Sequence, residues 1–80
     1  MVLGRQIAAA RALLGLGQKE LAEQANISIP TLKRMEASEG SASGLANNVA
    51  AVRAALETAG ITFLDNGEVS PGPGVALRLP

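Results

Sequence analysis

The stretch that decides the fold is QKELAEQANISIPTLKRMEAS, residues 18–38. Residues 18–25 and residues 28–37 each carry apolar side chains at helical spacing on one side. Asn26 lies between them, and asparagine tolerates the left-handed conformation that a tight break between two helices requires. The pattern predicts two short helices that cross at a steep angle through a turn of about three residues, which is a helix-turn-helix.

The residue types within this stretch meet the packing and capping needs of such a motif. Ser28 is a good N-cap for the second helix, and Pro30 suits the first turn, where its missing N–H has no helical partner. Ala22 supplies the small side chain that lets the two helices touch. We expect a buried inner surface made by Leu21, Ala22, Ala25, Ile27, Leu32 and Met35.

A further helix is predicted on each side of this motif. The first occupies about three turns before Gly15 and Gly17, which end it because glycine readily leaves the helical conformation. Its apolar positions are Leu3, Ile7, Ala10 and Leu14. The other is predicted to start at a Ser43 cap and to run to Ala59, with Gly60 as its stop. Its apolar stripe is Leu45, Val49, Val52, Leu56 and Ala59.

The period of the apolar pattern changes after Gly60. Residues 61–64 and 75–79 are short, partly β-branched runs, separated by a Gly- and Pro-rich stretch at 65–74. We expect a two-stranded antiparallel hairpin, which must pack on the helices or add to a sheet of another chain, since an isolated hairpin is barely stable. The predicted fold is therefore mainly α, with four to five helices.

Composition narrows the functional classes. The 80 residues make one domain and include no cysteine and no histidine, so disulfides, thiolate metal sites and the commonest general base are excluded. We see no nucleophile–base pair, phosphate-binding glycine loop or metal cluster, and therefore expect no enzymatic activity, cofactor or metal. No apolar run reaches the roughly 20 residues that cross a bilayer, and the N-terminus lacks a signal-peptide layout. We expect a soluble cytoplasmic protein.

The formal net charge is zero, which by itself counts against nucleic-acid binding. The charges are unevenly distributed, however. Residues 1–34 carry five basic and two acidic side chains, a net charge of +3, and residues 35–80 carry two basic and five acidic side chains, a net charge of −3. A positive first half fits a module that faces DNA, and chance scatter over a solvated surface is the alternative.

The segment LGLGQKELAEQANISIPTLKRME, residues 14–36, resembles the Cro/repressor (XRE-type) helix-turn-helix family of bacterial and phage DNA-binding regulators. The resemblance covers residues 6–56 and includes the glutamine that opens the second helix, the S-x-P-T-L that opens the next one, and the closing glutamate. It implies a lambda-repressor-like domain over residues 1–60. Residues 61–80 would be a C-terminal extension and a possible dimerisation element.

The resemblance also implies roles for individual residues. Gln18 corresponds to a glutamine that contacts a DNA phosphate, which suits the N–H donors at a helix start. Arg11 and Glu36 correspond to a buried ion pair with a structural role. The expected DNA-facing side of the recognition helix consists of Ser28, Ile29, Pro30, Thr31, Lys33 and Arg34. Among these, Thr31 could instead cap the helix or face inward.

The sequence departs from the family pattern at two positions. Gly17 stands where a serine is common, and Ile29 stands where a polar or basic residue is common. The expected function is transcriptional regulation by a homodimer bound to double-stranded DNA. A protein-binding module, either an anti-repressor or an antitoxin-like partner, is the alternative. Without the motif, Lys33 and Arg34 would suggest an ordinary solvated surface. Asn47 and Asn48, near the start of the fourth helix, could touch a phosphate, but residues of this kind are more often caps or surface.

Overall fold

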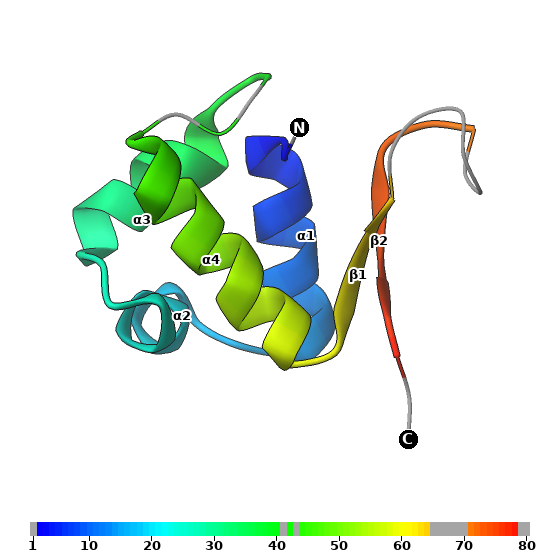
Figure 1. Ribbon diagram of the computed structural model, residues 1–80, viewed down its shortest axis with the longest axis horizontal. Coiled ribbons are helices and arrows are strands. Elements are labelled where there is room, and N and C mark those ends of the chain that lie inside the picture. The colour runs from blue at the N-terminus through cyan, green and yellow to red at the C-terminus, as the bar shows by residue number, and fades with distance from the viewer. Residues whose placement is uncertain (1, 41, 43, 65–70, 79–80) are drawn as a thin grey trace.

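The computed structural model describes residues 2–40, 42, 44–64 and 71–78. Within these ranges, four helices precede a small antiparallel hairpin at one end of the molecule (Figure 1). The elements are α1 (Gly4–Leu14), α2 (Gln18–Ala25), α3 (Ile29–Ala37), α4 (Ala46–Thr58), β1 (Ile61–Leu64) and β2 (Gly74–Leu77). The prediction of a mainly helical chain with a C-terminal hairpin is confirmed. None of the described helices has the length and apolar character needed to span a membrane.

Local backbone preferences set the ends of the first three helices. Gly15 ends α1 with φ of 70°, and Asn26 ends α2 with φ of 58°, so both adopt the left-handed conformation. Ser28 caps α3, since its Oγ accepts a hydrogen bond from the backbone N–H of Thr31 at 3.2 Å. The chain therefore leaves α2 and enters α3 within three residues, as the sequence predicts.

The core lies where the four helices meet. Ile7 of α1, Leu21 of α2, Leu32 of α3 and Leu56 of α4 are fully buried, and the side chain of Met35 joins them from α3. In this arrangement α2 packs against α4, and α1 packs against α3. The predicted inner surface is thus buried, except that Ile27 is half-buried at its edge.

The predicted start of the fourth helix is wrong. The helix begins at Ala46 with Leu45 at the N-cap position, and Ser43 lies outside the described residues. Leu45 is 69% exposed because its extended backbone removes the side chain from the helical register. Ala59, at the C-cap where the chain turns into β1, is also exposed. Burial is complete only in the middle of the predicted stripe, at Val52 and Leu56.

The hairpin packs on helices of its own chain. β1 contacts α4 and β2 contacts α1, with Ile61 buried and the side chains of Phe63, Val75 and Leu77 packed against the core. The buried side chain of Gln6 holds the hairpin onto α1, because its Nε2 donates to the carbonyl oxygens at the two strand ends near the loop. The second strand begins one residue earlier than predicted. Residues 65–70 of the predicted loop and Leu79 lie outside the described residues.

Candidate nucleic-acid interface

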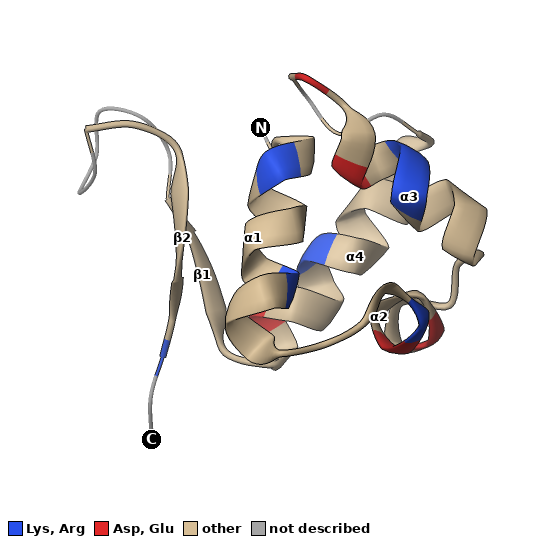
Figure 2. Ribbon diagram, turned by 180° about the vertical axis from the view of Figure 1, so that it is seen from behind, with Lys and Arg blue, Asp and Glu red and all other residues tan. Residues whose placement is uncertain are grey.

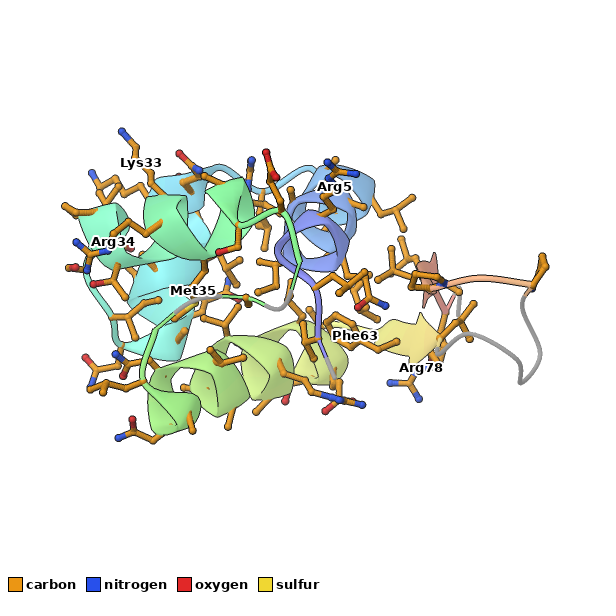
Figure 3. All side chains as sticks on the ribbon, turned by 90° about the horizontal axis from the view of Figure 1, so that it is seen from above. Arg5, Lys33, Arg34, Met35, Phe63 and Arg78 are labelled. Atoms are coloured by element: carbon orange, nitrogen blue, oxygen red, sulfur yellow. The ribbon has the colours of Figure 1, made fainter. Side chains whose placement is uncertain are left out.

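Helix α3 is divided into a buried side and an exposed side. Leu32 and Met35 are fully buried, whereas the side chains that were expected to face DNA are almost all exposed. Figure 3 shows Lys33 and Arg34 projecting away from the helical core, and Arg5 of α1 lies on the same side of the molecule as Lys33. The exposed set is Ser28, Ile29, Pro30, Lys33 and Arg34. The structure therefore brings these side chains together along one short helix.

The first turn of α3 has less free hydrogen-bonding capacity than its sequence suggests. The hydroxyl groups of Ser28 and Thr31 lie 2.8 Å apart and share a hydrogen bond, and Ser28 also caps the helix. Thr31 is only half exposed, so capping is the role that the geometry assigns to it. Ile29 is 37% exposed and can make only apolar contacts.

Arg11 and Glu36 form a two-pronged ion pair between α1 and α3. The Arg11 Nε donates to Glu36 Oε2 at 2.9 Å, and Nη2 donates to Oε1 at 3.0 Å. The Glu36 side chain is only 6% exposed, while that of Arg11 is 24% exposed. The hydrogen bond to Glu36 raises the pKa of Arg11 above its ordinary value against the opposing effect of burial, so the guanidinium stays charged. This pair fixes the angle of α3 relative to α1.

Gln18, expected as a phosphate contact, is held on the inner side of the interface. Its Nε2 donates to Glu36 Oε1 at 3.1 Å, so the same carboxylate binds side chains from α1 and from α2. The sequence pattern did not indicate this third partner, because it depends on how α2 lies against α3. Gln18 can still offer a phosphate its backbone N–H in the first turn of α2 and the second N–H of its amide.

The start of α2 is capped although Gly17 has no side chain. The carboxylate of Glu20 accepts a hydrogen bond from the Gly17 backbone N–H at 2.6 Å, which is one half of a capping box. This contact compensates in part for the missing serine. A glutamate three residues after the N-cap position is the sequence signal that could have revealed it. A phosphate at the start of α2 would also be repelled by the negative charge of Glu20.

The remaining charges separate into paired and accessible groups. Figure 2 shows basic and acidic segments together on α2, α3 and α4, and basic segments on α1 and just after β2. On α4, Arg53 pairs with Glu57 at 3.2 Å and lies over the ring of Phe63, 5.1 Å from its centroid. Lys33 forms no salt bridge within the described part of the chain. Its ammonium group is therefore accessible to an anionic partner.

Asn47 and Asn48 lie in the first turn of α4, at the end of the loop that follows α3. Asn47 is exposed and Asn48 is half-buried, and no hydrogen bond from either side chain is formed to the described residues. Their position is compatible with a surface role, and the geometry does not join them to the exposed side of α3.

Comparison with known proteins does not assign a family or a function to the chain. No protein-family model matches the chain, and the search of curated proteins gives no match. The residues of the chain itself, and first of all the exposed side of α3, therefore indicate the function.

Proposed function

We propose that the chain is a sequence-specific DNA-binding transcriptional regulator of the Cro/repressor (XRE) type. In this proposal α2, the turn at Asn26 and α3 form a helix-turn-helix within a lambda-repressor-like domain, and α3 enters the major groove. The observation that carries the proposal is the division of α3 into a fully buried apolar side and an exposed side with Lys33 and Arg34. The similarity of residues 14–36 to the family pattern supports it.

Each exposed group of α3 has a suitable partner in DNA. Lys33 and Arg34 can donate to guanine O6 and N7 or to phosphate oxygens, and Ile29 can contact a thymine methyl group. Ser28 offers one hydroxyl, although that group already caps the helix. The protein would act in the cytoplasm as a homodimer, with two copies of α3 in successive major grooves about 34 Å apart.

The test begins with selection of bound fragments from random DNA at several salt concentrations. A single enriched, two-fold symmetric sequence is expected, with affinity that falls steeply as salt rises because phosphate contacts release counterions. The Lys33→Ala/Arg34→Ala variant should lose about 2 kcal/mol or more of binding free energy on that sequence, roughly a 30-fold rise in Kd.

A matched control removes one positive charge away from α3. Arg53→Ala changes the net charge as much as Lys33→Ala but leaves α3 and the strand edges intact, so its affinity should remain within a few-fold of the unmodified protein, whereas Lys33→Ala alone should already weaken binding. Equal losses in Lys33→Ala and Arg53→Ala would show that only overall charge matters. Retention of full affinity by the α3 variant would refute the proposed interface.

One observation favours a second candidate, a protein-binding module of the anti-repressor or antitoxin-like kind. The net charge is zero, and Ile29 with the exposed Pro30 forms an apolar corner at the start of α3. Apolar corners of this kind suit a protein surface better than a phosphate backbone. The absence of any enriched DNA sequence at low salt would favour this candidate.

A further inference from the structure

The hydrogen-bond pattern of the hairpin leaves the outer edge of β2 open. The Arg78 N–H donates to the carbonyl oxygen of Gly60 at 2.8 Å, so these two residues form a hydrogen-bonded pair. Such pairs alternate with non-bonded pairs along an antiparallel ladder, so the backbone groups of Val75 and Leu77 point away from β1. Within the described part of the chain, no hydrogen bond from outside the hairpin reaches these backbone groups. An open edge of this kind is a template for another strand.

A cavity of about 320 Å³ lies between α1 and the start of β2. Leu3, Arg5, Gln6 and Ala9 line it from the α1 side, and Pro73, Gly74 and Val75 line it from the β2 side, so its walls are mainly apolar. Ala9 is exposed, and Leu13, one turn further along this flank of α1, is 49% exposed. The open strand edge is therefore flanked by apolar surface that a single copy of the chain leaves uncovered.

The edge of β2 is complementary to a second copy of itself. If two β2 strands run antiparallel with Ala76 opposite Ala76, Val75 of one chain exchanges both backbone hydrogen bonds with the partner's Leu77. Val75 and Leu77 both face the helices, so the partner's Leu77 would lie beside Val75, next to the cavity. The register is two-fold symmetric, as a closed dimer interface requires. It also places Arg78 opposite a glycine, so that no like charges meet.

We propose that the outer edge of β2 is the homodimer interface, paired antiparallel with Ala76 on the two-fold axis and with each Leu77 covering the cavity of the other chain. This inference rests on the homodimer in the proposed function and specifies its surface and register. The edge is only four residues long, from Gly74 to Leu77. The dimer is therefore weak and dissociates on dilution, since the interface is much smaller than that of a stable complex.

A cysteine placed on the proposed axis tests this register directly, because the chain has no cysteine of its own. Residues opposite one another in a non-hydrogen-bonded pair have Cα atoms about 4.5 Å apart, within the range that a disulfide spans. Ala76→Cys should therefore form a disulfide-linked dimer under mild oxidation without DNA, and the link should disappear on reduction. Thr62→Cys is the matched control, since Thr62 is the neighbour of Ala76 on β1 and is equally exposed.

The expected result is at least a tenfold faster cross-link for Ala76→Cys than for Thr62→Cys. Val75→Pro added to the Ala76→Cys chain removes an outward-pointing N–H and none of the hydrogen bonds to β1, so the hairpin should persist, as circular dichroism would check, while cross-linking falls to the rate of the control. Equal rates for the two cysteine variants, or a monomer in sedimentation at millimolar concentration, would overturn the inference. Because DNA is absent from these measurements, a failed cross-link leaves the test of Lys33 and Arg34 on DNA unaffected.

Discussion

The backbone at the start of α1 lies very close to the backbone at the C-terminal end of α3, so an added methyl group there tests how the two helices pack. Gly4 is the first residue of α1, and a Cβ atom there would overlap the carbonyl oxygen of Met35 and lie 2.9 Å from that of Ser38. Both atoms belong to the backbone at the C-terminal end of α3 and cannot rotate away. Gly4→Ala should therefore push the two helices apart.

Two opposing effects set the magnitude of this change. Alanine favours a helix over glycine by up to about 1 kcal/mol, which by itself would stabilise the protein. Overpacking against rigid backbone costs about 1–3 kcal/mol, and the overlap with two carbonyl oxygens places Gly4→Ala at the upper end of that range. We expect a net loss of about 2 kcal/mol in the free energy of unfolding. For a domain of this size that corresponds to a fall in Tm of about 8–16 °C.

Urea unfolding, monitored by far-ultraviolet circular dichroism, should show this loss as a lower urea concentration at the midpoint, with an unchanged dependence of the unfolding free energy on urea. Gly40→Ala is the control, because no atom of the described residues beyond its chain neighbours lies within 4 Å of its added Cβ, and its φ is not positive. That variant should differ from the unmodified protein by less than about 0.5 kcal/mol, or be slightly more stable. Identical midpoints for the two alanine variants would refute the close approach of α1 to α3.

Two further predictions concern the ion pair and the core. Arg11→Met should cost about 2–3 kcal/mol in urea unfolding because it leaves the nearly buried Glu36 without its cation, and Arg11→Met/Glu36→Leu, combined with the two single variants in a double-mutant cycle, should recover part of that loss. The raised pKa of Arg11 means that the guanidinium loses its charge, and with it the coupling, only in strongly alkaline solution, so the cycle should give one value across about pH 6–10. Leu56→Ala should cost about 3 kcal/mol in thermal or urea unfolding, whereas Leu45→Ala, at an exposed position, should change stability by less than about 0.5 kcal/mol.

Sequence reasoning succeeded where a single residue decides the local backbone. Gly15 and Asn26 take positive φ at the two predicted breaks, and Ser28 caps α3, because these preferences belong to the residues themselves. The bounds of α2 follow from the same signals. The two hairpin strands were also predictable, since their alternating pattern lies between clear turn residues.

Sequence reasoning failed where the partner of a side chain is distant along the chain. The Gln6 amide donates to Leu64 and Gly74, which are 58 and 68 residues away, and no pattern within the first helix indicates either contact. The contact of Gln18 with Glu36 has the same origin. Leu45 shows the opposite error: its spacing fits the apolar stripe, but the helix begins only after it. A regular spacing of apolar residues predicts a helix, but it does not show which residue begins the helix or which of the apolar side chains are buried.

The buried residues of α3 determine where its exposed side points. Leu32 and Met35 fix the helix from within, and Glu36 fixes its rotation by binding Arg11. Since these contacts are buried or nearly buried, changes on the exposed side should leave the angle of α3 unaltered. Under the proposed function, substitutions at Ile29 and Lys33 should therefore change which DNA sequence is bound without changing the fold, which sets only the direction of these side chains. An apolar first turn is then a matter of specificity and does not conflict with DNA binding.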